Sequence, residues 1–137
     1  MKLNTIVLTS LIFCFFIAAQ SFAQVTGELY KSGIDKSTKG DYQGAIADFT
    51  KVIALYPNEP KPYHYRGINK FNIQDYNGAI ADFDVAIGLN PKNGDTFYMR
   101  GMAKIGVKKR KEACADFQMA NQLGNRSASA ALDRYCR

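Results

Sequence analysis

The sequence is poor in the residues from which most catalytic and metal sites are built. Its 137 residues include no tryptophan, one histidine (His64) and three cysteines. Zinc sites usually take three or four His and Cys ligands, and a lone histidine does not supply them. No Gly-rich phosphate loop, G-x-S-x-G or H-E-x-x-H motif occurs. We therefore expect no enzyme, no metal and no cofactor.

Long apolar runs are also missing, with one exception near the start of the chain. Residues 6–19 form a largely apolar run of fourteen, which is shorter than the ~20 residues that span a bilayer. Lys2 precedes the run, and Ser21 and Ala23 follow it at the spacing of a secretory cleavage site. The pattern predicts a signal peptide over 1–23, cut before Gln24. Retention as an anchor and lipid modification of Cys14 remain open.

Neither sign of charge dominates the remaining 114 residues. Residues 24–137 hold 17 Lys and Arg against 12 Asp and Glu, a net charge of +5. So mild an excess, with no long stretch of one sign, does not indicate nucleic-acid binding. A chain of this length suits a single domain with a modest core.

A near-repeat of nine residues shows how that domain is organised. DYQGAIADF at 41–49 returns as DYNGAIADF at 75–83 and, altered, as KRKEACADF at 109–117. Between 41–57 and 75–91, eleven of seventeen residues are identical at an offset of 34. A fixed period of this size indicates stacked supersecondary units.

Each unit has the pattern of two helices. Apolar residues from Ala45 to Ile53 recur at i, i+4, i+7 and i+8, which is one face of a helix. Asp41 and Asp75 stand where an N-cap is needed, and Pro57 and Pro91 follow where a helix must stop. A further helix precedes this one in each unit, over about 27–38, 62–72 and 95–106.

These features resemble the tetratricopeptide repeat (TPR) family. The period, the small residues of each hairpin, an aromatic residue on its second helix and the closing proline carry the resemblance. The matching residues are Gly33, Ala45, Phe49, Val52 and Pro57, then Tyr63, Gly67, Ala79, Phe83, Ala86 and Pro91, then Phe97, Gly101, Ala113, Phe117 and Ala120. The resemblance implies an all-α solenoid of three TPR hairpins (26–59, 60–93 and 94–125) with a capping helix at 126–136, about seven helices in all.

The recurring residues predict how the hairpins pack. We expect the three glycines to lie where the helices of a hairpin cross, and the three phenylalanines to fill the space between units. Arg66 and Arg100 replace a residue that is usually large and apolar in the family. We expect them to pair across the unit boundary with a column of acidic residues, although a ligand site remains open. That column is Asp48, Asp82 and Asp116.

Cys114 and Cys136 are the two cysteines beyond the expected signal peptide. Their midpoint, residue 125, falls in the Gly124-Asn125 turn between the expected helices 110–122 and 127–136. Residues equidistant from such a turn face each other, so we predict a structural disulfide. A pair of free buried thiols and a redox pair remain alternatives.

The resemblance also implies a concave groove lined by the first helix of each hairpin, which would bind a protein partner. Its expected residues are Tyr30, Ile34, His64, Ile68, Phe71, Tyr98, Met102 and Ile105, and the alternative that some of them complete the core remains open. Other family members hold the C-terminal carboxylate of cytosolic chaperones with Lys, Asn and Arg. The matching positions here are Tyr30, Ile34, Tyr65, Asp95 and Met99, so that clamp is absent.

The function predicted is a noncatalytic protein-interaction module, an adaptor or scaffold in the cell envelope, periplasmic or secreted. We expect a protein or peptide partner, no nucleic acid and no permanent membrane span. Two alternatives remain. One is a self-assembling structural unit. The other is a surface adaptor that contacts an anionic polymer or membrane through Lys108, Lys109, Arg110 and Lys111.

Overall fold

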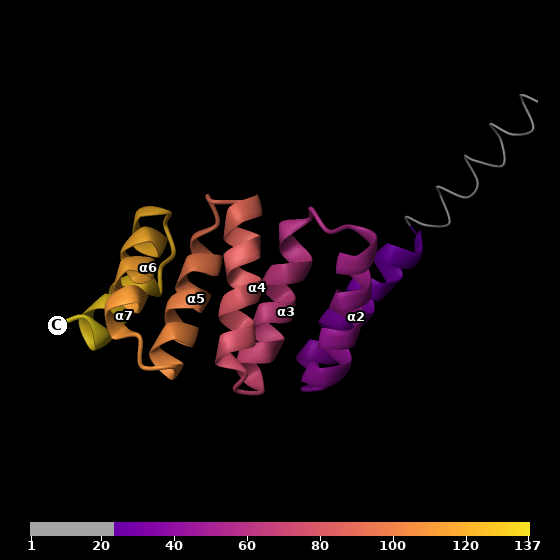
Figure 1. Ribbon diagram of the computed structural model, residues 1–137, viewed down its shortest axis with the longest axis horizontal. Helices are drawn as coiled ribbons and strands as arrows, with labels where there is room; N and C mark the ends of the chain where they lie inside the picture. The colour runs from indigo at the N-terminus through magenta and orange to yellow at the C-terminus, as the bar shows by residue number, and fades with distance from the viewer. Residues whose placement is uncertain (1–23) are drawn as a thin grey trace, which may run out of the picture.

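The computed structural model describes residues 24–137, which form a row of antiparallel helices (Figure 1). These residues contain seven helices and no strand. The helices are residues 24–38, α2 (Tyr42–Leu55), α3 (Pro60–Asn72), α4 (Tyr76–Leu89), α5 (Gly94–Gly106), α6 (Arg110–Gln122) and α7 (Ala128–Tyr135). The all-α solenoid of three hairpins and a closing helix is thereby confirmed. The expected signal peptide lies outside the described residues.

The hairpins pair the helix at 24–38 with α2, α3 with α4, and α5 with α6. Each second helix also packs against the first helix of the next unit, and α6 packs in this way against α7. We call the helix at 24–38, α3 and α5 the A helices, and α2, α4 and α6 the B helices. α3 and α5 also contact each other directly. The surface formed by the A helices and α7 is called the A-helix face below.

Two B helices begin at the caps that the sequence predicts. The Asp41 carboxylate accepts a hydrogen bond from the backbone N–H of Gly44 at 2.9 Å, and Asp75 accepts one from Gly78 at 3.0 Å. These bonds satisfy donors that the first turn of a helix leaves unpaired. The third B helix, α6, has Lys109 at its N-cap position, which makes no side-chain cap bond, because the repeat has lost its aspartate there.

In the core of each hairpin a phenylalanine lies on a glycine. Phe49, Phe83 and Phe117 are all fully buried. A Cβ added to Gly67 would lie 2.6 Å from the ring of Phe83, and the same contact recurs between Gly101 and Phe117. The predicted need for glycine is confirmed, but each phenylalanine, which we expected between units, lies against the glycine of its own hairpin. Burying such a ring contributes roughly 2–3 kcal/mol.

The turn between the helices of each hairpin requires a left-handed residue. Gly40 fills this position in the first hairpin with φ +82°, but Gln74 and Lys108 fill it in the others with φ 65° and 63°. A side chain in this conformation costs about 1–2 kcal/mol. Replacing such a residue by glycine would remove this cost. Part of the gain would be lost, because glycine has more conformational freedom to lose from the unfolded chain.

We therefore expect Gln74→Gly to raise the free energy of unfolding by about 0.5 kcal/mol. Urea denaturation followed by circular dichroism measures the change. Asn72→Gly serves as the matched control, because Asn72 is the last residue of α3 and glycine is a poorer helix former than asparagine. The control should be less stable than the parent protein. A Gln74→Gly variant that is also less stable would show that φ is not strained there.

Candidate binding face

The eight residues expected in the groove are all half-buried, so each shows part of its side chain to solvent. Most of them pack against the seams between helices. Ile68 and Phe71 lie against the cluster around Phe83, and Met102 and Ile105 lie against the cluster around Phe117. These eight residues are called the stripe below. The expectation that some of them complete the core thus fits the structure. Contact of the exposed parts with a partner stays a prediction.

Aromatic rings join the first two hairpins along the stripe. The Tyr30 ring meets Phe49 and Tyr65 edge-on at 5.6 Å and 5.7 Å between centroids, and Phe49 stacks on Tyr65 at 5.7 Å. Burial raises the pKa of the Tyr30 hydroxyl, and the neighbouring Tyr65 raises it further. The Tyr30 hydroxyl therefore stays neutral. Its ring packs between the first and second hairpins. Edge-on and stacked aromatic pairs of this kind each contribute roughly 1 kcal/mol.

His64 belongs to α3, and its side chain contacts α5. Its Nδ1 is 2.9 Å from the Thr96 hydroxyl, and its ring contacts Tyr65 and Phe83. Burial lowers the pKa of His64 from its ordinary value of 6.5, although the charge of Asp95 acts in the opposite direction. The folded protein therefore favours the neutral imidazole.

This shift makes stability depend on pH in a defined window. The folded protein binds a proton at His64 less readily than the unfolded chain does. The contribution of neutral His64 to the free energy of unfolding is therefore fully present above pH 6.5. It declines as the pH falls from there toward the lower pKa of the folded state. We expect the melting temperature to drop between pH 7.5 and 5.5, and the drop to be smaller in His64→Gln. Equal drops in both proteins would show that His64 is not the titrating group.

A column of ion pairs runs beside the stripe and occupies both arginines that sequence analysis singled out. Arg66 binds the buried Asp82 through Nε at 2.8 Å and Nη2 at 2.6 Å, and Arg100 binds Asp116 at 2.9 Å and 2.6 Å in the same way. Hydrogen bonding to Asp82 raises the pKa of Arg66. Bidentate pairs of this kind are the stronger class of ion pair.

The expected pairing across unit boundaries is wrong for these carboxylates. Arg66 and Asp82 belong to the same hairpin, because residues sixteen apart face each other where the two helices cross. The bond across the boundary comes from the third guanidinium nitrogen instead, to Thr50 at 3.1 Å from Arg66 and to Asp84 at 2.7 Å from Arg100. Both arginines are thus used internally and are not available to a ligand.

The first hairpin keeps the acidic residue of the column but not the arginine. Burial alone would raise the pKa of Asp48, but hydrogen bonds from Lys36 at 2.7 Å and Ser32 at 2.6 Å outweigh it and lower the pKa. Asp48 therefore stays ionised in the folded protein. Its carboxylate is satisfied by two residues of the helix at 24–38, so the column is structural in all three hairpins.

A pocket of about 480 Å³ opens between α5 and α7. Tyr98 and Met102 of α5 line one side, and Arg126, Arg134 and Tyr135 line the other together with small residues at the start of α7. Only Tyr98 and Met102 were among the expected groove residues. Arg134 follows Arg100 at the repeat period, as Arg100 follows Arg66, and this spacing is the signal that sequence analysis missed.

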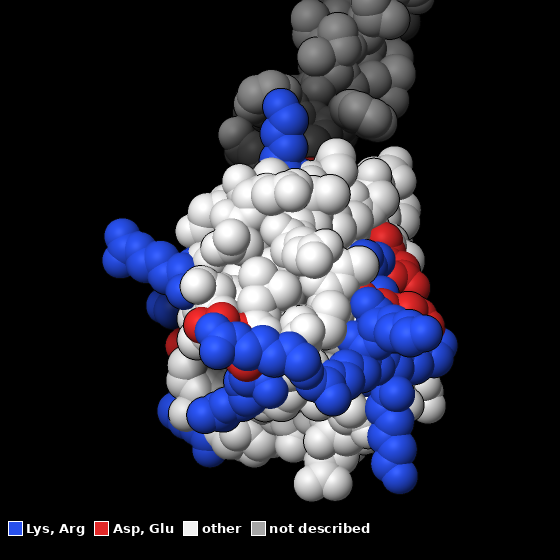
Figure 2. Space-filling view, turned by 90° about the vertical axis from the view of Figure 1, so that its left-hand side faces the viewer, with Lys and Arg blue, Asp and Glu red and all other residues white. Residues whose placement is uncertain are grey.

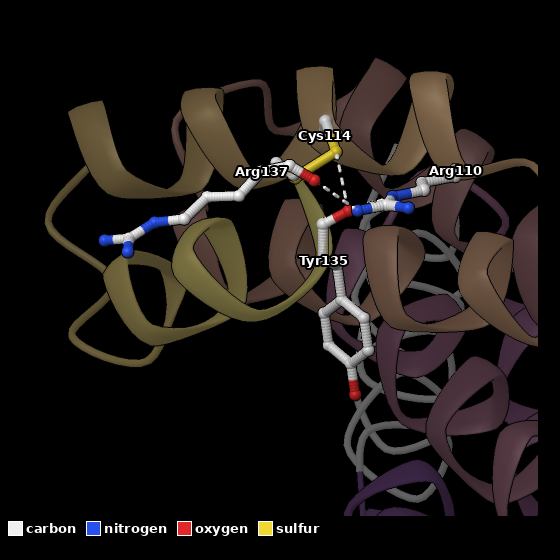
Figure 3. Close-up of a disulfide and its surroundings, with 5 residues drawn as sticks. Arg110, Cys114, Tyr135 and Arg137 are labelled. Atoms are coloured by element: carbon white, nitrogen blue, oxygen red, sulfur yellow. Dashed lines mark hydrogen bonds between the residues drawn. A yellow bond between two sulfur atoms is a disulfide. The ribbon is translucent and has the colours of Figure 1, made fainter.

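One residue of the basic run at 108–111 makes internal contacts, and contact of the run with an anionic surface stays a prediction. The Arg110 guanidinium donates hydrogen bonds to the carbonyl oxygens of Tyr135 and Arg137, the latter at 2.7 Å (Figure 3). It therefore caps the C-terminal end of α7. Lys108, Lys109 and Lys111 are exposed around a shallow depression of about 280 Å³. Lys109 lies 3.9 Å from the Glu112 carboxylate, so Lys108 and Lys111 are the two lysines of the run without an ion pair among the described residues.

Cys114 and Cys136 meet at the junction of α6 and α7. Their sulfur atoms are bonded at 2.06 Å across a sequence separation of 22 (Figure 3). The bond and the Arg110 cap hold the same end of α7 against α6. They thereby fix the helix that carries Arg134 and Tyr135 beside the pocket. The oxidation state of the pair in the cell stays a prediction.

Three further observations bear on what this face can do. The clamp positions Tyr65 and Asp95 serve internal contacts, since Tyr65 stacks on Phe49 and Asp95 accepts a hydrogen bond from Asn125 at 2.7 Å. Residues 24–137 contain no cluster of three or more His, Cys, Asp or Glu side chains arranged to hold a metal ion. Within the same residues, no helix has the length and apolar character needed to cross a membrane.

Comparison with solved structures finds many similar chains. The second TPR domain of human RPAP3, in complex with the HSP70 peptide SGPTIEEVD, is 27% identical, with 82% of this chain and 98% of that chain covered and a TM-score of 0.75. The first TPR domain of Spaghetti (RPAP3), bound to the HSP90 peptide SRMEEVD, is 25% identical, with 82% and 91% covered and a TM-score of 0.79.

The TPR domain of Arabidopsis OM64 shares the fold at 23% identity, with 84% of this chain and 97% of that chain covered and a TM-score of 0.81. No profile of a known family and no curated protein matches the chain in sequence. The fixed repeat period, the three in-phase hairpins and these structural likenesses agree with one another. Residues 24–137 therefore have the fold of a tetratricopeptide repeat domain, and the chain is similar to solved TPR domains over most of its length.

Proposed function

We propose that this protein is a noncatalytic adaptor that binds a segment of a partner protein on its A-helix face. The observation that carries the proposal is the row of half-buried aromatic and aliphatic side chains along the A helices and into the α5–α7 pocket. Aromatic residues and methionine are enriched at protein interfaces. Two structural neighbours are TPR domains that hold peptides, which supports the same use of the fold here.

The chemistry of the face decides which kind of segment fits. The positions with which relatives hold a chaperone carboxylate carry no cation and no asparagine, namely Tyr30, Ile34, Tyr65, Asp95 and Met99. The arginines of α3 and α5 are committed to Asp82 and Asp116. The stripe along the A helices therefore favours apolar or aromatic side chains, presented by an extended strand or by one face of a helix.

A display experiment tests the proposal. A library of random twelve-residue peptides is selected on the immobilised full-length protein, and an enriched peptide is measured by calorimetry. We expect Ile34→Arg, on the stripe, to weaken binding at least about tenfold, because it places a charge against an apolar segment. Val85→Arg is the matched control, because Val85 is 42% exposed on the B helix α4.

The control should bind as the parent does, and both variants should keep the parent's helical spectrum. Binding that survives Ile34→Arg but is lost in Val85→Arg would move the site to the B helices and contradict the proposal. Enrichment of no peptide would contradict the proposal as a whole. Light scattering over a range of concentrations tests the self-assembly alternative, which predicts a mass that rises with concentration.

We also propose that the protein acts outside the cytoplasm, in the periplasm or after secretion. The layout of residues 1–23 and the pair of cysteines support this. Sequencing the N-terminus of protein recovered from the envelope fraction should find Gln24 as the first residue. An intact Met1 in that fraction would favour an anchor, and recovery from the cytoplasm alone would contradict export.

One observation favours a second candidate, an adaptor for an anionic surface. Residues 108–137 hold seven Lys and Arg against three Asp and Glu, whereas residues 24–107 hold ten against nine. Figure 2 shows Lys and Arg side chains forming a band across this end of the molecule. Binding to vesicles of mixed neutral and anionic lipid tests this candidate. Binding that disappears at high salt and in the variant Lys108→Gln/Lys111→Gln would support it, and equal binding to purely neutral vesicles would contradict it.

A further inference from the structure

The α5–α7 pocket differs from the rest of the A-helix face because it carries positive charge without an internal partner. We propose that it binds a carboxylate-bearing part of the segment that lies along the A-helix face. This inference rests on the proposed function and adds the chemistry of one end of the partner. The partner is an acidic peptide segment, recognised by Arg126 and Arg134 of the pocket lining and by the aromatic rings of Tyr98 and Tyr135 in the same lining.

The ion pairs of the fold show why these arginines are available. Arg66 and Arg100 each bind a buried aspartate. Arg134 continues their spacing on α7, but among residues 24–137 no ion pair joins it or Arg126 to a carboxylate. A guanidinium is always charged and matches a carboxylate through two parallel hydrogen bonds. Arg134 therefore repeats the sequence position of the arginines in the internal column, but its guanidinium is left open to a carboxylate of a partner.

The distribution of charge along the chain also supports an acidic partner. Four of the five net positive charges of residues 24–137 fall within residues 108–137, which form the turn before α6, α6 itself and α7. A surface of one sign raises the local concentration of ligands of opposite sign and speeds their association. An acidic segment is thus drawn to this end of the solenoid before it makes close contact.

The shape of the pocket favours a peptide over a flat anionic surface. The arginines lie beside a recess whose walls include Tyr98, Met102 and Tyr135, and its 480 Å³ is within the range of about 300–1,000 Å³ typical of ligand sites. A membrane surface does not enter such a recess, whereas one or two side chains of a peptide do. Tyr98 and Met102 also belong to the stripe, so a segment lying on α5 reaches the arginines without a break.

The anchoring of α7 keeps the site in place before a ligand arrives. The bond between Cys114 and Cys136 and the Arg110 cap hold one end of α7, and the Tyr135 ring stacks on the buried Phe117 at 6.0 Å between centroids. A site that is already ordered loses less conformational entropy on binding. Arg134 is therefore presented on a fixed helix, and Arg126 lies in the turn that leads into this helix.

The peptide selection tests the inference through the composition of the enriched sequences. We expect Asp and Glu to be at least about twofold more frequent in peptides selected on the parent protein than in the starting library. Selection on Arg126→Gln/Arg134→Gln should return the frequency to that of the library. The control Lys108→Gln/Lys111→Gln removes the same charge outside the pocket and should keep the enrichment.

Affinity measurements give the second readout. One enriched acidic peptide should bind Arg126→Gln/Arg134→Gln about three- to tenfold more weakly than the parent, and its Asn and Gln analogue should bind both proteins alike. Both arginines are exposed, so the variant should melt within about 2 °C of the parent.

The outcomes separate the two claims. Peptides enriched without any excess of Asp and Glu would overturn the acidic pocket while leaving the binding module intact. Failure to enrich any peptide would overturn the module and the pocket together. An acidic preference lost equally in the lysine control would also overturn the pocket, because it would assign the preference to net charge.

Discussion

Replacing Phe83 by alanine is expected to lower the free energy of unfolding by about 4 kcal/mol and the melting temperature by about 15 °C. Phe83 is fully buried in the middle hairpin, where its ring covers Gly67 and contacts His64. In a solenoid each unit is stabilised by its neighbours, so this loss also weakens the coupling between the two ends. Thermal and urea unfolding followed by circular dichroism measure the effect.

A double-mutant cycle tests whether the effect comes from the contact between the Phe83 ring and Gly67. Gly67→Ala alone should cost about 1–3 kcal/mol, because its Cβ would lie 2.6 Å from the Phe83 ring. In the Phe83→Ala background the same change should be neutral or stabilising, since the space is free and alanine is a better helix former than glycine. Val85→Ala, at an exposed position of the same helix, should change stability by less than about 0.5 kcal/mol. Additive effects of Gly67→Ala and Phe83→Ala would contradict the packing described here.

Reducing the bond between Cys114 and Cys136 is expected to lower stability by about 3 kcal/mol. The bond closes a loop with a sequence separation of 22, and the chain-entropy account assigns about this value to a loop of that length. The loss should fall mainly on α7, which is eight residues long and too short to be stable alone. Hydrogen exchange should therefore quicken at amides of α7 before those of α3 and α4.

The control for this prediction is the variant Cys114→Ala/Cys136→Ala, whose melting temperature should not respond to reductant. Alkylation followed by mass spectrometry should find no free thiol in protein made under oxidising conditions. Two free thiols in that sample, or equal stability with and without reductant, would show that the pair plays no structural role. Because α7 carries Arg134, reduction should also weaken binding of an acidic peptide.

Much of the fold was predictable because each signal comes from local chemistry repeated at a fixed spacing. Asp41 and Asp75 mark helix starts because a short acidic side chain satisfies free N–H groups in the first turn. The pairing of Cys114 with Cys136 followed from their equal distances to the turn at residue 125. Recurrence of the glycine and phenylalanine signals in all three hairpins, at one constant period, left little freedom in the architecture.

The pairing of Arg66 and Arg100 was predicted incorrectly, and the information needed was present in the sequence. Gly67 and Phe83 are sixteen residues apart and meet at the helix crossing, so Arg66 and Asp82, each one residue earlier, must also meet. The error was to assign the acidic column to the boundary between units. The unit boundary is instead bridged by Thr50 and Asp84.

The pocket beside α7 could not be predicted in the same way. Its walls come from α5 and from a helix that lies outside the repeat, and its volume depends on how that helix is held by Cys136 and Arg110. A spacing rule gives the register of Arg134 but not the depth of a recess. The half-buried state of the stripe residues was equally inaccessible, since periodicity assigns a residue to a face and not to a degree of exposure.

Site-specific photocross-linking in the cells that make the protein tests the central claim most directly. A photoreactive amino acid is placed at Ile34 or Met102 on the A-helix face and, for comparison, at Val85 or Leu89 on α4, which are 42% and 38% exposed. Protein binding on the A-helix face predicts a discrete cross-linked partner from the first two positions and none from the other two. Cross-links confined to Val85 and Leu89 would contradict it.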